Sequence, residues 1–186
     1  MNKLASTLVA VGAASTPWGW FGLGASSRGL TACNWPWADE PEARQRISEA
    51  ILKRAGFEIV TDSHVELNSY IEQAAEALLA FFAGSPARLD KMPLDLSLHT
   101  DWQQKVLLFV RAVPFGKTIS YGEAAARCGS PRGARAVGTA MAGNQLPIFI
   151  PCHRVIYGDG KTGNYSGGGP ELKKSLLLFE KERRGW

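Results

Sequence analysis

The sequence predicts an α+β protein built from two small domains. Short apolar runs broken by glycine and proline dominate its first part, amphipathic helical patterns dominate its second part, and residues 89–98 show no helical period. We therefore expect an amino-terminal domain at 1–98 and a carboxy-terminal domain at 99–186. A length of 186 residues suits one large domain or two small ones, and 45% hydrophobic and 20% charged residues argue against disordered, collagen-like and coiled-coil chains.

The amino-terminal half alternates strand and helix patterns. A first strand is expected to end at the Thr16-Pro17-Trp18-Gly19 turn, and residues 18–37 predict a hairpin or meander. Apolar residues at helical spacing predict helices over 39–56 and 68–82, with a short strand at 57–61 between them. The apolar stretch at the amino end only weakly resembles a secretory signal, so we expect no cleavage and no secretion.

The carboxy-terminal half is predicted to be mostly helical. Helical patterns cover 101–113, 121–127 and 132–142, and Ser120 is placed to cap the second of these helices. A tight Gly-Ser-Pro turn joins the second helix to the third, which predicts a helix-turn-helix. Residues 146–156 are apolar and are expected to be extended.

A glycine-rich loop and a final helix complete the prediction. Residues 158–169 contain six glycines and must form a loop. Pro170 then suits the first turn of a helix that is expected to run to about Arg183.

Positive charge is concentrated in the second half of the chain. Residues 1–98 hold 8 lysines and arginines against 11 aspartates and glutamates, and residues 99–186 hold 13 against 6, so the formal net charge of +4 divides into −3 and +7. A polyanion would therefore be drawn to the carboxy-terminal half.

No apolar run reaches the length of about 18 residues that spans a membrane. Three cysteines cannot build a disulfide framework, and no cysteine and histidine cluster suggests structural zinc.

One apolar segment carries reactive side chains. Residues 150–156, Ile-Pro-Cys-His-Arg-Val-Ile, place the Cys152 thiol beside an imidazole and a guanidinium. A thiol in apolar surroundings is normally inert, whereas nearby positive charge can supply a thiolate. Neighbours in an extended segment point to opposite faces, so Cys152 and His153 would need a bridging water or a local turn to interact. From adjacency alone, a core cysteine beside a surface histidine is the favoured interpretation.

The complete motif resembles the active-site signature of the O6-alkylguanine-DNA alkyltransferases, also called methylated-DNA–protein-cysteine methyltransferases. Further segments across 101–182 resemble this family in the same order: Val-Pro-Phe-Gly-Lys-Thr-Ile-Ser-Tyr-Gly-Glu from Val113, Gly-Ser-Pro-Arg-Gly-Ala-Arg-Ala-Val-Gly from Gly129, Ala-Gly-Asn-Gln from Ala142 and Gly-Asn-Tyr-Ser-Gly-Gly from Gly163. The first 100 residues resemble the family's variable amino-terminal domain only loosely. The sheet-with-helix form expected there rests mostly on this resemblance.

The resemblance implies DNA repair by direct damage reversal. A guanine alkylated at O6 would be flipped out of duplex DNA, and its alkyl group would pass irreversibly to Cys152 in a single-turnover reaction. O4-alkylthymine is a further candidate substrate. By the same resemblance, His153 receives the thiol proton through a water, Glu180 orients the imidazole, and Asn144 bonds the backbone near the cysteine. Tyr121 would crowd the neighbouring phosphate and then hydrogen-bond the base.

The resemblance also implies a DNA-binding surface on the second helix of the helix-turn-helix. Arg135 matches the arginine that fills the gap left by the flipped base, and the family docks this helix in the minor groove. Small residues, Ala134 and Gly138 among them, would let the helix lie deep in that groove, with close packing against another helix as the alternative. Arg132 and Lys117 are expected phosphate contacts, or else solvated charges.

A pocket for the flipped base is the last implied feature. Its apolar walls and the glycine loop over it would come from Met141, Val155, Tyr165 and Ser166. The loop's N–H groups could donate to the guanine oxygen, where charge develops. We expect no cofactor and no metal, because Ser26 and Thr31 stand where the hairpin aligns with zinc ligands of some family members.

Double-stranded DNA containing alkylated guanine is the expected partner, bound by a monomer in the cytoplasm, at the nucleoid, or in the nucleus. Whether several molecules bind DNA cooperatively is left open.

One alternative is a non-enzymatic alkyl-lesion-binding sensor, which Cys152 argues against because such relatives carry another residue there. A Cys–His hydrolase is the other alternative, with His99 as its additional histidine. Residues 99–103, His-Thr-Asp-Trp-Gln, depart from the family's Gly-Thr-x-Phe-Gln.

Overall fold

The computed structural model describes residues 7–54, 56–60 and 64–183. It divides the chain into two compact units, residues 1–95 and 96–186. Residues 1–6, where the signal-like stretch begins, and Thr61 of the expected short strand lie outside the described residues, and the rest of that stretch belongs to a strand. Within the described part of the chain, no helix is long and apolar enough to cross a membrane.

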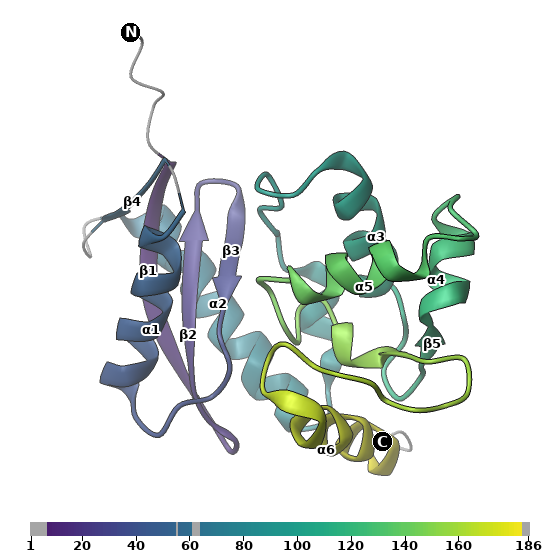
Figure 1. Ribbon diagram of the computed structural model, residues 1–186. Helices are drawn as coiled ribbons and strands as arrows, with labels where there is room; N and C mark the ends of the chain where they lie inside the picture. The colour runs from purple at the N-terminus through teal and green to yellow at the C-terminus, as the bar shows by residue number, and fades with distance from the viewer. Residues whose placement is uncertain (1–6, 55, 61–63, 184–186) are drawn as a thin grey trace, which may run out of the picture. The chain divides into compact units, whose positions relative to one another are not determined.

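A four-stranded sheet forms the centre of the amino-terminal unit (Figure 1). Its strands are β1 (Thr7–Thr16), β2 (Gly19–Ser26), β3 (Gly29–Cys33) and β4 (Phe57–Val60), in the order β3-β2-β1-β4. The β1–β2 and β2–β3 pairs are antiparallel, which confirms the predicted meander, and β4 pairs parallel to β1. The sheet and its helices confirm the α+β prediction for this unit.

Helices α1 (Glu40–Leu52) and α2 (Val65–Phe82) cover opposite faces of this sheet (Figure 1). The Asp39 side chain caps α1, and the helix buries Ala43, Ile47 and Ile51. The helix predicted over 39–56 ends earlier, at Leu52, because Gly56 turns the chain into β4 with a φ of 81°. The helix predicted over 68–82 begins earlier, at Val65.

Glycine lets α1 lie close to the sheet. A side chain at Gly22 would collide with the carbonyl oxygen of Ala43 and would come within 2.9 Å of Ile47 Cβ. The apolar face of α1 therefore packs directly on the backbone of β2, with Val9 and Ala32 in the same core cluster.

The segment expected as a linker or edge strand over 89–98 is different in the structure. Residues Pro86–Lys91 form a short 3-10 helix, and only an isolated bridge joins Leu94 to Leu30. Asp95 anchors the segment, since its carboxylate accepts hydrogen bonds from Ser26 Oγ at 2.6 Å and from an Arg28 guanidinium nitrogen at 3.1 Å. Ser26, one of the positions compared with zinc ligands, is thus engaged with Asp95.

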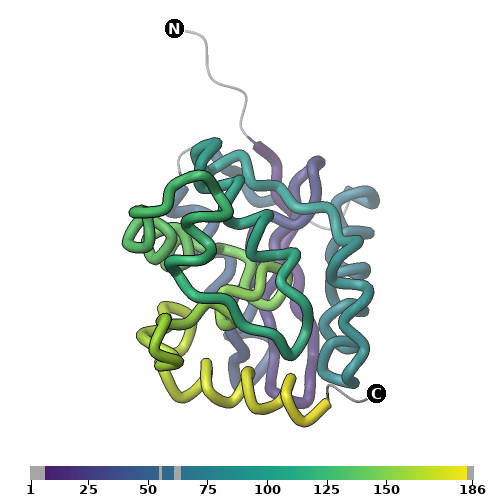
Figure 2. Tube along the Cα trace, turned by 90° about the vertical axis from the view of Figure 1, so that its right-hand side faces the viewer, coloured from purple at the N-terminus to yellow at the C-terminus, as the bar shows by residue number. Residues whose placement is uncertain are grey.

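The carboxy-terminal unit is mostly helical, as predicted (Figure 2). Its elements are α3 (Asp101–Arg111), β5 (Ile119–Ser120), α4 (Tyr121–Arg127), α5 (Ala134–Ala142), the 3-10 turn η2 (Cys152–Arg154), β6 (Val155–Ile156) and α6 (Gly169–Glu182). Helices α3, α4 and α5 pack against one another. Strands β5 and β6 pair in parallel, with Ser120 opposite Ile156.

Helices α4 and α5 form the predicted helix-turn-helix. Ser120 caps α4 by accepting the Glu123 backbone N–H at 3.0 Å. The second helix was expected from residue 132, but it begins at Ala134. The turn before it is closed by a 2.7 Å hydrogen bond from Gly133 N to Ser130 O, which keeps Arg132 outside the helix.

The prediction that residues 146–156 are extended is wrong. Only Val155 and Ile156 are in a strand, and Cys152 begins a single 3-10 turn. Ile148 has a φ of 70° and is 1% exposed, an unusual conformation for a β-branched residue. Strain of this kind costs on the order of 1–3 kcal/mol and persists where the surrounding structure imposes it.

Alanine at two glycines should have opposite effects on stability. Gly22→Ala should lower the free energy of unfolding by about 1–3 kcal/mol, because the new methyl group collides with α1. Gly138→Ala should raise it by up to about 1 kcal/mol, because a Cβ on Gly138 meets no atom within 4 Å and alanine favours the helix. Denaturant unfolding of both variants tests this, and a stabilised Gly22→Ala protein would contradict the packing.

Candidate active site

The candidate nucleophile lies in the 3-10 turn before β6. Cys152 N donates to Ile150 O at 2.8 Å and Arg154 N to Pro151 O at 2.9 Å, so the chain folds tightly around the thiol. Cys152 is 5% exposed. This turn, rather than an extended strand, sets the directions of the adjacent cysteine and histidine side chains.

Asn144 connects the end of α5 to the cysteine. Its amide nitrogen donates to Cys152 Sγ at 3.1 Å and to Ile150 O at 2.9 Å, and its amide oxygen accepts from Leu146 N at 3.0 Å. The Tyr165 hydroxyl lies 3.7 Å from Sγ on another side. Burial raises the pKa of the Cys152 thiol, and the hydrogen bonds of Asn144 and Tyr165 act in the opposite direction.

A buried lysine that the sequence analysis missed completes the surroundings of the thiol. Lys173 on α6 is 0% exposed, and its Nζ donates to Val155 O at 2.6 Å. The ammonium lies 5.7 Å from the ring centres of both Tyr121 and Tyr165. Burial lowers the pKa of Lys173 to about 8, while attraction to Cys152 raises it. The charge of Lys173 in turn lowers the thiol pKa.

Glu180 is the most heavily hydrogen-bonded side chain of the site. Its carboxylate accepts from His153 Nε2 at 2.7 Å, from Arg154 Nε at 3.0 Å and Nη2 at 2.9 Å, and from Gly116 N at 2.9 Å. Burial by itself would raise the pKa of Glu180. The hydrogen bonds and charges of His153 and Arg154 prevail and lower that pKa to about 2. Glu180 is therefore ionised and faces inward, although a solvated glutamate is the usual case.

The contact with Glu180 fixes the state of His153. An ionised carboxylate can only accept, so Nε2 carries the proton that is donated to Glu180. Burial lowers the pKa of His153 and prevails over Glu180, whose hydrogen bond and charge raise it. The charges of Arg154 and Lys173 also lower this pKa, so the ring is neutral at neutral pH. The unprotonated Nδ1 is buried and has no hydrogen-bond partner among the described residues. His153 thus has one nitrogen held by Glu180 and one available to accept a proton.

Arg154 ties the same carboxylate to the turn after α3. Its Nη1 donates to Val113 O at 2.5 Å, and its guanidinium lies 5.7 Å from the Phe115 ring centre. The sequence places this guanidinium beside the cysteine but carries no signal for its contact with Val113. The pair with Glu180 neutralises a charge that is 5% exposed.

A pocket of about 470 Å³ opens onto Cys152, within the size range of small-molecule sites. Three predicted wall residues, Met141, Tyr165 and Ser166, line it. Val155 does not line it, which corrects that expectation: its side chain is fully buried and its backbone pairs with Ile119. The complete lining is Tyr121, Ala134, Arg135, Gly138, Met141, Ala142, Cys152, Tyr157, Asn164, Tyr165 and Ser166.

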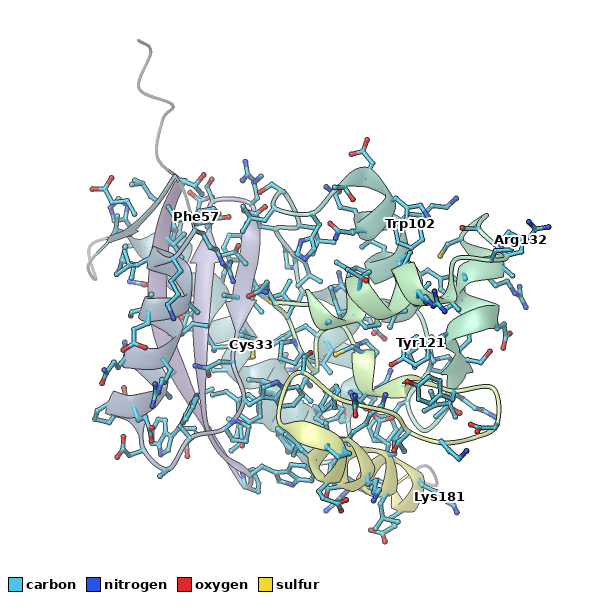
Figure 3. The ribbon with its side chains drawn as sticks, in the orientation of Figure 1. Cys33, Phe57, Trp102, Tyr121, Arg132 and Lys181 are labelled. Carbon is cyan, nitrogen blue, oxygen red and sulfur yellow. The ribbon has the colours of Figure 1, made fainter. Side chains whose placement is uncertain are left out.

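The pairing of β5 with β6 explains an aromatic wall of the pocket that sequence reasoning only half identified. Tyr121 and Tyr157 each follow the end of one of these paired strands, and their ring centres are 5.4 Å apart. Tyr157 was not predicted, because a tyrosine at the start of a glycine-rich loop carries no signal for a pocket. Figure 3 shows Tyr121 beside the loop that leads to α6.

One face of α5 borders the pocket. Arg135 and Gly138 line the pocket, whereas Val137 and Ala140 are buried on the other face. Gly138 has open space where a side chain would lie, so packing within the protein does not explain this glycine. Arg132 projects outward from the turn before α5 (Figure 3), and it and Lys117 are exposed and outside the pocket lining.

The fold and this site define a class of protein: a helix-turn-helix domain whose second helix borders a pocket with a buried thiol. A family model for the 6-O-methylguanine DNA methyltransferase DNA-binding domain matches residues 101–182. The structure is similar to a crystal structure of Mycobacterium tuberculosis OGT in complex with DNA, with a TM-score of 0.68 and 31% identity over 95% of this chain and 94% of that chain. The chain belongs to the 6-O-methylguanine DNA methyltransferase family.

Curated relatives match a little more than half of the chain. A methylated-DNA–protein-cysteine methyltransferase of Rattus norvegicus is 46% identical over 110 residues, which are 56% of this chain and 53% of that protein. The protein of the same name from Mycobacterium tuberculosis is 46% identical over 110 residues, 59% of this chain and 65% of that protein. The matches thus span between half and two thirds of these relatives. A structure from the archaeon Pyrococcus kodakaraensis has a TM-score of 0.62 and 26% identity, covering 92% of this chain and 98% of that chain.

Removing the charge of Glu180 should destabilise the carboxy-terminal unit strongly. Glu180→Gln leaves the buried Arg154 guanidinium without a counter-charge, which typically costs about 3–5 kcal/mol. Glu182→Gln on the same helix is the matched control, because Glu182 is exposed, and it should change stability by less than about 0.5 kcal/mol. Urea unfolding of both variants measures the difference.

The contribution of Glu180 should depend on pH in a defined direction. Its pKa is about 2 in the folded protein against an ordinary value of 4.5, so its stabilisation is complete above pH 4.5 and is lost as the pH falls toward 2. The gap in unfolding free energy between the wild type and Glu180→Gln should therefore shrink across that window. A gap that stays constant down to pH 2 would show that the carboxylate is not held in its ionised form.

Proposed function

We propose that this protein repairs alkylated guanine in double-stranded DNA by transferring the alkyl group from guanine O6 to Cys152 Sγ. The observation that carries the proposal is the thiol itself, which lies at an apolar pocket while hydrogen-bonded to Asn144 and attracted by the Lys173 ammonium. A purely structural cysteine in a core needs none of these polar partners. Family membership and the DNA complex of the similar M. tuberculosis protein support the same reaction.

The thiol loses its proton before the transfer. His153 Nδ1 is the basic nitrogen nearest in sequence, and a water between it and Sγ would carry the proton, with Nε2 held by Glu180 throughout. The thiolate left behind faces the Lys173 ammonium and the Asn144 amide, which stabilise its charge. His153 acts as a proton acceptor and a positioning group, because burial disfavours a long-lived imidazolium.

The transfer forms one bond and breaks one bond. Sγ attacks the alkyl carbon, a carbon–sulfur bond forms, the carbon–O6 bond breaks, and its electron pair stays on the guanine, which then takes a proton. Backbone N–H groups of the loop from Ser166 would donate to the oxygen where this charge develops. The product is a thioether without an easy reverse or hydrolytic route at neutral pH, so each molecule acts once.

The base reaches the thiol by leaving the duplex. The position of Arg135 and Gly138 in the pocket lining supports insertion of α5 into the minor groove, with Arg135 filling the gap left by the flipped base. Tyr121 would contact the flipped nucleotide, and the exposed Arg132 and Lys117 would contact phosphates. The carboxy-terminal domain thus holds both the DNA-binding and the alkyl-transfer functions, and the protein acts as a monomer where DNA is, at the nucleoid or in the nucleus.

The decisive experiment follows the alkyl group. Incubation with duplex DNA containing one O6-methylguanine should add one methyl group to Cys152 and remove it from the DNA, in a yield that never exceeds one per protein molecule. Peptide mass spectrometry and analysis of the digested DNA measure both changes, and Cys152→Ser is the control. Tight binding to the lesion with an unmodified Cys152 would instead identify a non-enzymatic sensor. A parallel duplex with O4-methylthymine tests the wider substrate range.

Arg135→Ala should separate base extrusion from chemistry. Methyl transfer from duplex DNA should slow by about tenfold or more, because a lost contact worth 1.4 kcal/mol changes a rate by about that factor. Reaction with free O6-benzylguanine needs no extrusion and should stay near the wild-type rate. Arg127→Ala is the matched control, since Arg127 is exposed at the end of α4 and lies outside the pocket lining. Equal slowing of both reactions would refute the assignment of Arg135.

A further inference from the structure

His99 is a histidine of the carboxy-terminal unit that the proposed reaction does not use. It stands where the segment 99–103 departs from the family pattern, and it does not line the pocket. A Cys–His hydrolase would need it as a base, but among the described residues its recorded side-chain partner is Gly143 O rather than Cys152. The position of this side chain therefore calls for another explanation.

The backbone around His99 holds the imidazole in one place. His99 N donates to Leu96 O at 2.9 Å, and His99 O accepts from the Gln104 side chain at 2.9 Å. The next residue, Thr100, caps α3 and forms a capping box with Gln103. His99 is thereby fixed immediately before the first turn of α3.

The imidazole bonds the carboxy-terminal end of α5. His99 Nε2 lies 3.2 Å from Gly143 O, and since a carbonyl only accepts, Nε2 is the protonated nitrogen. The other nitrogen, Nδ1, is buried without a hydrogen-bond partner among the described residues. A buried polar atom of this kind costs free energy. The protein therefore keeps the imidazole bonded to Gly143 O although its Nδ1 remains without a partner among the described residues.

Gly143 is the residue before Asn144, whose amide donates to Cys152 Sγ. Gly143 caps α5, and its carbonyl also accepts from the Gln145 side chain at 3.2 Å. Asn144 N donates back to Met141 O at 3.2 Å, so the orientation of the Asn144 side chain depends on how this helix end is held. The carbonyl that His99 bonds thus belongs to the peptide group that joins Gly143 to Asn144, the residue whose side chain donates to Sγ.

We propose that His99 is a positioning residue for the nucleophile, which acts through Gly143 and Asn144 to aim the Asn144 amide at Cys152 Sγ. His99 holds the peptide that precedes Asn144, and Asn144 holds the sulfur. The inference rests on the proposed role of Cys152 as the nucleophile, but it concerns the thiol alone and needs no DNA for its test.

The test measures the reactivity of the Cys152 thiol toward iodoacetamide between pH 5 and 10 by peptide mass spectrometry. His99→Leu replaces the imidazole by an apolar side chain of similar size and so removes the donor. His99→Gln supplies a side-chain amide that can still donate to Gly143 O. The Leu variant should react about three- to tenfold more slowly at neutral pH, and its thiol pKa should shift upward. The reason is that the hydrogen bond from the Asn144 amide to the Cys152 thiolate weakens. The Gln variant should react within about twofold of the wild type.

A double-variant cycle shows whether the effect passes through Asn144. His99→Leu should add no further slowing in an Asn144→Ala background, and His64→Ala, in the other unit, should leave the rate and pH profile unchanged. Independent, additive slowing, or an unchanged pH profile in His99→Leu, would overturn the proposal.

If His99→Leu does not fold, a folded His99→Gln variant that reacts tenfold more slowly than the wild type would overturn it equally. If the wild-type protein reacts normally with iodoacetamide but transfers no methyl group from DNA, the proposed function is contradicted and the role of His99 is not.

Discussion

The Glu180 carboxylate is the interaction on which the rest of the site depends. It joins the turn after α3, the 3-10 turn of the cysteine and helix α6, because Gly116, His153 and Arg154 all donate to it. Its negative charge neutralises Arg154 and fixes which nitrogen of His153 carries a proton. That leaves the buried Lys173 ammonium without a carboxylate partner among the recorded contacts, and Cys152 is the acidic group that interacts with it. When the thiol is ionised, the site holds two buried pairs of opposite charge, Arg154 with Glu180 and Lys173 with Cys152. When the thiol is neutral, the Lys173 ammonium has no opposite charge beside it among the described residues of the site.

This arrangement explains how a thiol in apolar surroundings can be reactive. Burial alone makes Cys152 less acidic, as it does for Cys33, whose thiol pKa is also raised by burial without any opposing group. The two cysteines differ in their neighbours and not in their exposure, since they are 5% and 6% exposed. Desolvation strengthens the attraction between Lys173 and the thiolate, so the same burial that suppresses ionisation makes the counter-charge more effective.

Much of this protein could be predicted from its sequence, and the parts that could not have physical reasons. Helical periodicity located α2, α3 and α6, and Ser120 correctly marked the start of α4, because these signals are local. Glu180 was expected at the site from the family resemblance, and its spacing of four residues from Leu176 agrees with an inward position. Lys173 lies seven residues before Glu180 on α6, but a lysine is usually exposed, so the sequence carries no sign of its burial. Its inward position depends on tertiary neighbours, namely the Val155 carbonyl that accepts from Nζ and the rings of Tyr121 and Tyr165. The turn at Cys152 was missed because no local signal marks it, whereas side-chain contacts such as those of Asn144 to Ile150 O and Cys152 Sγ hold the segment in place.

The protonation state of His153 tests this account most directly. Nitrogen-15 NMR of the imidazole side chains distinguishes a neutral ring with a protonated Nε2 from the other tautomer and from the doubly protonated cation, and His153→Asn assigns the signals among the three histidines. We expect His153 to stay neutral with its proton on Nε2 between pH 7 and 8. A doubly protonated His153 across that range would mean that Glu180 is paired with an imidazolium, and it would contradict the proposed division of charge.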